Sequence, residues 1–138
     1  MPWADNPDLD REMDALFDRA DEAMAEAAAG FLREVLDQPG AGVKWPGLPN
    51  PSSAPGAYPA RQSGDLLKSI GAQKVGQEWH FGSFNAPPEA WALEYPSPPD
   101  SPITRQSAHG ARPWLSKFLG DELGHKVVWD ALDSILGR

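Results

Sequence analysis

The side chains that could do chemistry are scattered through this sequence of 138 residues. His80, His109 and His125 fall in a predicted strand, a loop and a predicted helix, and no His-Glu-x-x-His pair or similar ligand spacing joins them. The chain has no cysteine, which excludes disulfides, thiolate metal sites and cysteine nucleophiles. We therefore expect neither a metal site nor a cofactor.

The carboxylates of Glu89 and Glu94 flank Trp91 and are the residue types that glycoside hydrolysis uses. Two acids at this spacing are common in proteins of any function. The sequence has no phosphate-binding loop, dinucleotide fingerprint or Gly-x-Ser-x-Gly elbow, and Gly40-x-Gly42 is an isolated fragment. The sequence predicts a protein that is not an enzyme. A small hydrolase without a recognisable motif is one alternative.

Tryptophan is abundant, with six residues in the chain. Trp79, Trp91 and Trp129 suit a core, whereas Trp3 and Trp45 lie in segments without a core of their own. Tryptophan beside proline suits subunit contacts, because aromatic side chains anchor interfaces. A carbohydrate- or protein-binding module with an aromatic platform is the rival interpretation. The residues predicted to contact other subunits are Trp3, Trp45, Tyr58, Trp91 and Trp114.

Residues 8–37 are predicted to form one long acidic helix. Asp5 or Asn6 before Pro7 is a suitable start, and Pro39-Gly40 ends the segment. Small residues in its middle let another helix approach closely. Apolar residues recur mostly in steps of three and four, at Leu9, Met13, Leu16, Phe17, Ala20, Met24, Ala27, Phe31 and Val35.

The middle of the chain predicts a proline-rich arm followed by a small sheet. Residues 38–60 contain six prolines and four glycines, which favour an extended arm or ordered loop. A loop of this length is usually functional or bound to a partner. Ser63 can cap a short helix over residues 65–68, and residues 70–75 and 78–84 are predicted strands with a turn between them.

A second proline-rich region, residues 85–113, is interrupted by residues 90–95, which suit a short helix or a strand. Residues 113–136 are predicted to form the last helix, because Pro113 is tolerated in a first turn. The apolar face of this helix is Leu115, Phe118, Leu119, Leu123, Val127, Val128, Ala131, Leu132 and Ile135. The sequence thus predicts a single α+β domain over residues 1–138, with a long N-terminal helix, a small antiparallel sheet within residues 61–112, a C-terminal helix and two long proline-rich loops.

The net charge of −8 is confined to residues 1–37, most of which form the predicted N-terminal helix. Residues 1–37 carry eleven acids and three arginines, and residues 38–138 carry nine acids and nine bases. Without a basic stripe, specific binding of nucleic acid is not expected. The acidic N-terminus does not resemble a signal peptide, and no apolar run reaches the ~18 residues of a membrane span. We expect a protein that is made in the cytoplasm and has no membrane partner.

Two segments carry a resemblance to a known family. Residues 58–70, Tyr-Pro-Ala-Arg-Gln-Ser-Gly-Asp-Leu-Leu-Lys-Ser-Ile, resemble the "P-x-R-x-(S/T)-G-x-L-x-x-S-I" stretch of small head–tail junction and tail-completion proteins of long-tailed phages. This is the "gene product ten-like" family, which is similar to the lambda minor tail protein Z. Residues 91–95 and 111–115 resemble its "Y-A-x-x-(V/L)-E-(F/Y)-G … A-R-P-F-(L/M)" ending. Pro96 replaces the expected glycine, so the following loop must start extended.

The motif residues are interpreted as scaffold. Gly64 permits a tight helix entry, Ser69 can bond back to the helix backbone, and Arg112 can form an ion pair with Glu94. Such a pair would join the two halves of the second motif at the base of the loop 96–111. The predicted structural residues are Arg61, Gly64, Leu67, Ser69, Ile70, Glu94, Arg112 and Pro113.

The resemblance implies a structural protein of a virion or phage-derived particle, located at the head–tail junction after synthesis in the host cytoplasm. It implies a homo-oligomeric ring that joins the portal, adaptor or stopper protein to the tail terminator or tail tube protein, without catalytic activity. Genome DNA would pass through this ring without specific binding. The acidic helix would then either border the channel, where it repels phosphates, or form a solvated outer face.

Overall fold

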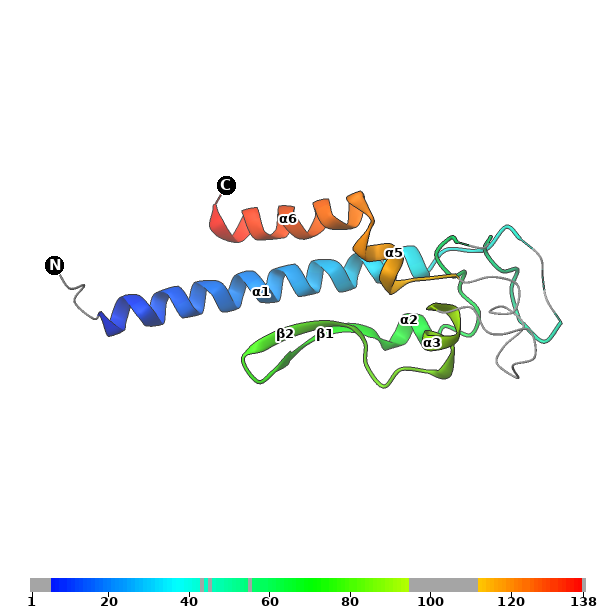
Figure 1. Cartoon of the computed structure of the whole chain (residues 1–138), viewed down its shortest axis with the longest axis horizontal. Coiled ribbons are helices and arrows are strands. Elements are labelled where there is room, and N and C mark those ends of the chain that lie inside the picture. The colour runs from blue at the N-terminus through cyan, green and yellow to red at the C-terminus, as the bar shows by residue number, and fades with distance from the viewer. Residues whose placement is uncertain (1–5, 43, 45, 55, 95–111, 138) are drawn as a thin grey trace.

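The computed structural model describes residues 6–42, 44, 46–54, 56–94 and 112–137. It confirms the predicted α+β class, with a long N-terminal helix, a two-stranded antiparallel sheet and C-terminal helices (Figure 1). The elements in chain order are α1 (Pro7–Leu36), α2 (Asp65–Ser69), β1 (Ile70–Val75), β2 (Glu78–Ser83), α3 (Pro88–Glu94), α5 (Leu115–Leu119) and α6 (Glu122–Leu136).

Helix α1 begins and ends where local sequence signals predict. The side chain of Asn6 accepts a hydrogen bond from the backbone N–H of Leu9 at 3.1 Å, and Pro7 occupies the first turn, where no N–H partner is needed. Asp8 and Asp10 stabilise the positive end of the helix dipole. The helix ends at Leu36, three residues before Pro39. The prediction of one continuous helix is confirmed.

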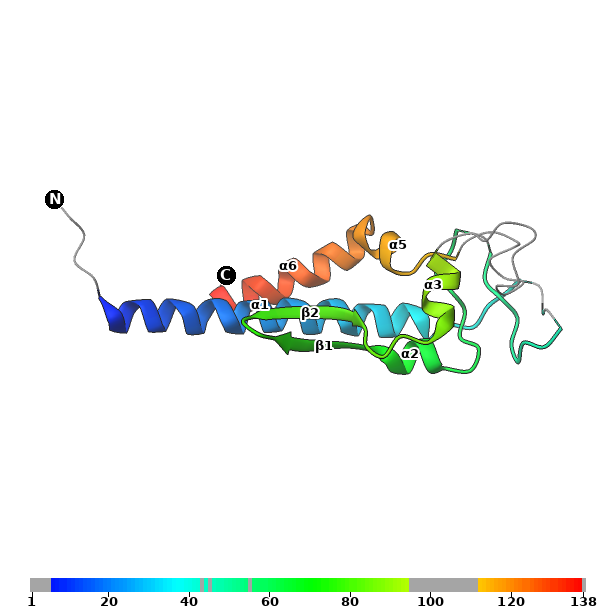
Figure 2. The ribbon, with the colours of Figure 1, turned by 60° about the horizontal axis from the view of Figure 1, so that its bottom comes forward.

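Strands β1 and β2 form a hairpin that lies along α1 (Figures 1 and 2). Gly76, with φ of +63°, supplies the left-handed turn between Val75 and Glu78. The hairpin is attached to α1 near this turn: the indole N–H of Trp79 donates to Asp18 at 3.1 Å, and Lys74 forms an ion pair with Asp18 at 2.6 Å.

The prediction of one continuous helix over residues 113–136 is wrong. The segment forms two helices, α5 and α6, separated at Gly120 and Asp121. Asp121 is extended, and its Oδ1 accepts hydrogen bonds from the backbone N–H groups of Leu123 and Gly124 at 3.0 and 3.3 Å. Gly120 is a weak helix former, and aspartate is a strong N-terminal cap, so the chain begins a new helix here.

The core lies between the second half of α1, helices α2, α3 and α5 and the start of β1, and partly buried residues of β2 and α6 pack against it. Phe118 is central to it, because its ring packs against Phe31 at 5.9 Å and Phe81 at 5.4 Å between centroids. Buried alanines on α1 and Gly124 on α6 allow close packing of the helices. The buried apolar cluster consists of Ala28, Ala29, Leu32, Leu36, Leu66, Ile70, Ala90, Leu93, Trp114 and Phe118.

The molecule is elongated, because the N-terminal part of α1 extends beyond both the hairpin and α6 (Figures 1 and 2). Helices α2 and α3 lie near the opposite end of α1, beside the proline-rich segment that follows it. Residues 90–95, predicted as a short helix or a strand, fall largely in helix α3. The predicted loop 96–111 lies outside the described residues.

Candidate functional site

The two halves of the second motif meet at the start of α5. The backbone N–H of Arg112 donates to the carbonyl of Leu93 at 2.9 Å. The carboxylate of Glu94 accepts hydrogen bonds from the backbone N–H groups of Trp114, Leu115 and Ser116 at 2.9, 3.0 and 2.9 Å. Glu94 therefore caps the N-terminus of α5 from a distant position in the sequence, where the unpaired N–H groups favour an anion.

The predicted ion pair between Glu94 and Arg112 is wrong. The ion pairs of the described residues do not include it, and the Glu94 carboxylate is bonded to helix N–H groups instead. Burial alone would raise the pKa of Glu94, but the hydrogen bonds from Ser116, Trp114 and Leu115 outweigh burial and lower this pKa. The motif halves are joined as expected, through a helix terminus and the backbone.

Arg112 is buried and points toward the proline-rich segment. Its Nε donates to the carbonyl of Ser53 at 3.2 Å, and burial lowers the pKa of its guanidinium. Ser52 beside it is also buried, and its backbone carbonyl accepts the N–H of Gly42 at 2.9 Å. A Cβ at Gly40 would lie 2.3 Å from the carbonyl oxygen of Pro51, so only glycine fits there. The contacts of Gly40 and Gly42 bring the two ends of the segment 40–53 together, and Arg112 joins its described part to the chain that leads into α5.

The first motif forms the junction between α2 and β1. Gly64 precedes α2 with φ of +90°, a conformation that favours glycine, as predicted. The hydroxyl of Ser69 bonds back to the carbonyl of Leu66 at 2.6 Å, also as predicted, and lies 2.6 Å from the hydroxyl of Ser83 on β2. Ile70 is buried and Leu67 is half-buried against the core. The motif is thus structural in this chain.

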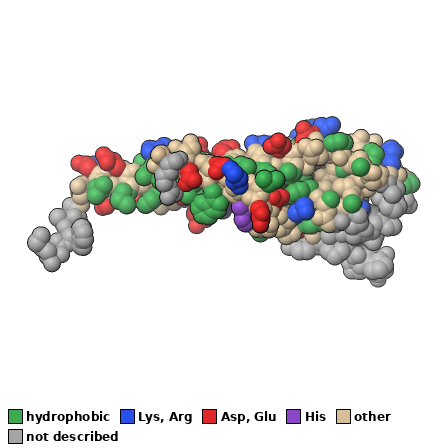
Figure 3. Space-filling model, turned by 90° about the horizontal axis from the view of Figure 1, so that it is seen from above, with side chains coloured by type: hydrophobic (Ala, Val, Ile, Leu, Met, Phe, Trp, Pro, Cys, Tyr) green, Lys and Arg blue, Asp and Glu red, His purple; other side chains and the backbone are tan. Residues whose placement is uncertain are grey.

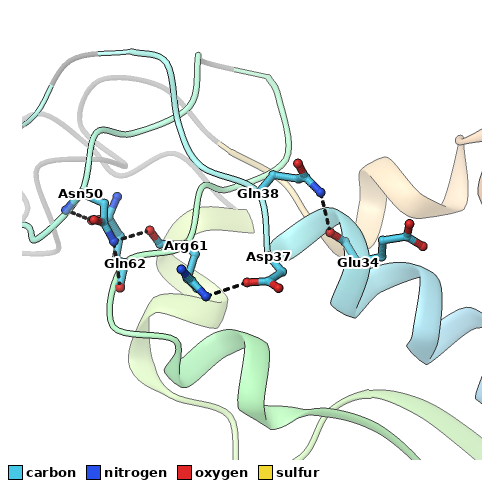
Figure 4. A network of polar contacts seen from close by, with 6 residues as sticks. All are labelled: Glu34, Asp37, Gln38, Asn50, Arg61 and Gln62. Carbon is cyan, nitrogen blue, oxygen red and sulfur yellow. Dashed lines mark hydrogen bonds and ion pairs between the residues drawn. The ribbon is translucent and has the colours of Figure 1, made fainter.

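Around Arg61, polar contacts join the end of α1 to the proline-rich segment (Figure 4). Arg61 forms an exposed ion pair with Asp37 at 2.8 Å, and its backbone N–H donates to the carbonyl of Gln38 at 3.1 Å. The side chain of Asn50 donates to the carbonyls of Arg61 and Gln62, and its backbone N–H donates to the Gln62 side chain at 3.0 Å. Arg61 therefore has a structural position, as predicted.

Two of the five aromatic residues predicted to contact other subunits make contacts within this chain. Trp114 is buried, and its indole N–H donates to the carbonyl of Ala90 at 2.8 Å. It belongs to the core, so its assignment to a subunit interface is corrected. Tyr58 is half-buried and donates to Asp121 at 2.8 Å, with the ammonium of Lys117 5.2 Å from its ring centroid.

The remaining predictions concern three tryptophans, Pro113 and the proline-rich segment. Trp3 and Trp45 lie outside the described residues, and Trp91 lies in α3. Pro113 is half-buried and precedes α5 rather than occupying its first turn. In the proline-rich segment the described residues 46–54 carry no helix or strand, as expected of a loop or arm.

Exposed apolar side chains gather on α1, α5 and α6. Figure 3 shows hydrophobic side chains along the projecting part of α1, among acidic ones. The exposed large hydrophobic residues are Leu9, Met13, Phe17, Val75, Leu119, Leu123, Val127, Trp129 and Leu136. Soluble monomers rarely expose large continuous apolar patches, because contact with water is unfavourable for apolar side chains. Such patches are therefore typical of protein interaction sites.

The sequence predicted no individual role for Asp121 or Asp18. Asp121 caps α6 and also accepts the hydrogen bond of Tyr58, which lowers the pKa of Asp121. Asp121, which follows Gly120 and precedes the acidic Glu122, was a visible helix-capping signal. Asp18 bonds to Lys74 and Trp79, which lie more than 50 residues further along the chain, and no local sequence pattern predicts such contacts.

Within the described residues, no three histidine, aspartate or glutamate side chains gather closely enough to hold a metal ion. No described helix is long and apolar enough to cross a membrane. Comparison with models of known protein families gave no match, and comparison with curated proteins and with solved structures found none similar to this chain.

Proposed function

We propose that this protein is a structural component of the neck of a tailed phage or phage-derived particle. In this role it forms a homo-oligomeric ring between the portal, adaptor or stopper protein and the tail terminator or tail tube protein. The protein has no catalytic role in this proposal, and its location is the head–tail junction of the virion.

The observation that carries the proposal is the exposed apolar surface at two sites of an elongated chain. Leu9, Met13 and Phe17 lie on the projecting part of α1, and Leu123, Val127 and Trp129 lie on α6. A ring subunit must present surfaces to neighbours on two sides, and the buried centres of such interfaces are more apolar than the rest of a protein surface.

The motif geometry supports the same function. The Glu94 carboxylate and the backbone of Leu93 join the two halves of the second motif. Buried residues of both motifs, Leu66, Ile70, Leu93 and Trp114, belong to one apolar cluster. The polar groups of the motifs bond within this chain, Tyr58 to Asp121, Arg61 to Asp37 and Glu94 to backbone N–H groups, as expected of a scaffold. The resemblance to the tail-completion family rests on these same segments.

Deletion of the coding sequence from a producing strain tests this proposal. The expected result is a mixture of DNA-filled heads and free tails, and the wild-type chain supplied in trans should restore joined particles. Electron microscopy with an antibody to the chain should place it at the neck of complemented particles. Joined, infectious particles made without the chain would contradict the proposal.

A further inference from the structure

The first three turns of α1 carry an apolar surface that the rest of the chain leaves uncovered. Residues 6–15 are all exposed, and the hairpin is attached to α1 only further along, at Asp18. Leu9, Met13 and Phe17 are 50%, 43% and 54% exposed and follow each other at intervals of one turn. We call these three residues the apolar ridge. Because a solvated helix of this length is marginal by itself, a partner that covers the ridge would stabilise it.

A second apolar surface is concave. This apolar groove, of about 600 Å³, lies between α1, β2 and α6. Ala25 and Ala28 of α1, Trp79 and Phe81 of β2, and Val128 and Trp129 of α6 contribute to its lining. The side chain of Trp129 is 58% exposed. The groove can therefore accept a row of apolar side chains from outside.

The ridge cannot fill the groove of its own chain. Ala25 and Ala28, which line the groove, and the ridge residues belong to one continuous helix, Pro7–Leu36. Figures 1 and 2 show α1 as an uninterrupted rod. Because a rod does not fold back on itself, any contact between ridge and groove must join two molecules.

Charge disfavours the contact of two ridges with each other. Residues 7–22 hold seven acids and two arginines, a net charge of −5, so two such segments side by side would repel. The groove presents fewer like charges, because Asp21 and Glu78 are its only acidic lining residues in the described part of the chain. Residues 38–138, which supply most of the lining, are neutral overall.

We propose that the apolar ridge of one copy docks in the apolar groove of a second copy of this chain. The two surfaces differ, so the contact is head-to-tail, and its repetition closes a ring when the rotation between copies allows closure. The inference rests on the proposed ring and gives it a specific contact. Unlike the location in a particle, the contact can be measured on the purified chain.

Disulfide trapping tests the contact directly, because the natural chain has no cysteine. Met13→Cys and Gln77→Cys chains are mixed and oxidised, and each chain is also oxidised alone; Gln77 is exposed and lines the groove. The proposal expects covalent dimers in the mixture and few in the Met13→Cys sample. Efficient crosslinking of Met13→Cys alone would establish contact between two ridges and overturn the proposal. The absence of crosslinks in every sample at high concentration would overturn it as well.

Sedimentation velocity tests the same contact without covalent bonds. Phe17→Ser and Trp129→Ser should each weaken self-association at least about tenfold, and the double variant should be little worse, because both remove one contact. Leu136→Ser is the matched control, since Leu136 is 39% exposed on α6 but does not line the groove. Circular dichroism should show unchanged helix content. Undiminished association of Phe17→Ser, or equal loss in the control, contradicts the contact.

Failure of the contact and failure of the proposed function are distinguishable. If crosslinks form as expected but the chain is absent from purified particles, the contact stands and the neck assignment falls. If the chain lies at the neck but the mixture gives no crosslink, the neck assignment stands and a different surface joins the copies.

Discussion

The hydroxyl of Tyr58 donates a 2.8 Å hydrogen bond to Oδ2 of Asp121, which joins the proline-rich segment to the start of α6. Asp121 uses its other oxygen to cap the helix through Leu123 and Gly124. Burial, together with the neighbouring carboxylate, raises the pKa of Tyr58, and the phenol hydrogen bond lowers the pKa of Asp121. The Asp121 carboxylate thus caps α6 and also binds the proline-rich segment through Tyr58.

Removal of the Tyr58 hydroxyl should release this loop while the helix cap remains. Tyr58→Phe is expected to lower the free energy of unfolding by about 1–2 kcal/mol, because a hydrogen bond to a charged group is lost at a partly exposed site. Asp121→Ala should cost more, since the cap is lost as well. Urea unfolding of both single variants and the double variant measures the coupling. Strictly additive losses would show that the bond contributes nothing.

Glu94 should make stability depend on pH in the acidic range. Its pKa is lowered from 4.5 in the folded chain, so its contribution is fully present above that value and is lost as the pH falls through the folded-state pKa. Glu94→Gln is expected to cost about 1–2 kcal/mol at neutral pH, because the charge-assisted hydrogen bonds to the α5 terminus weaken. The difference from the wild type should shrink in acid.

Urea unfolding at several pH values measures this difference. The matched control is Glu26→Gln, at an exposed position of α1, which should change the free energy of unfolding by less than about 0.5 kcal/mol. A Glu94→Gln variant as stable as the wild type at neutral pH would contradict the assigned role.

Two helical glycines should respond to alanine in opposite directions. No heavy atom of the described residues outside its own helix lies within 4 Å of a Cβ built on Gly30, so Gly30→Ala should stabilise by about 0.5–1 kcal/mol. A Cβ at Gly124 would lie 2.8 Å from the ring of Phe118 and 3.3 Å from that of Phe31. Gly124→Ala should therefore destabilise by about 1–3 kcal/mol despite its better helix propensity. Thermal unfolding of both variants measures the contrast, and stabilisation by Gly124→Ala would refute the packing.

The acidic side of α1 is proposed to border the channel of the ring. Substitution of lysine at Asp10, Asp14 and Glu22 changes the net charge from −8 to −2 and touches only exposed side chains. Asp18 and Asp21 are spared, because Asp18 holds Lys74 and Trp79 and Asp21 lines the groove. At low salt the triple variant should slow DNA ejection while assembly stays normal, since phosphates now bind the lining.

The control for the channel prediction is the set Asp10→Asn, Asp14→Asn and Glu22→Gln, which removes charge without adding cations. Its effect on ejection should be smaller and less dependent on salt. Unchanged ejection kinetics of the lysine variant in normal particles would indicate a solvated outer face.

The sequence by itself determined the elements whose signals are local. Asn6 and Pro7 start α1, Gly76 turns the hairpin, Gly64 enters α2, and each acts through atoms only a few residues away. For the same reason the hydroxyl of Ser69 was correctly assigned to the helix backbone. Such features depend on backbone conformation and short-range hydrogen bonds, which the residue types fix directly.

Only the tertiary structure decided which partners distant residues find. Their opposite charges predicted an ion pair between Arg112 and Glu94. In the structure the Glu94 carboxylate instead accepts hydrogen bonds from the unpaired N–H groups at the start of α5. Trp114 was assigned to an interface, and it is buried against Ala90. Helical spacing placed Leu9, Met13 and Phe17 on one side of α1, but spacing does not say how far the hairpin and α6 extend along it. Burial depends on what covers a face, and that is a property of the whole fold.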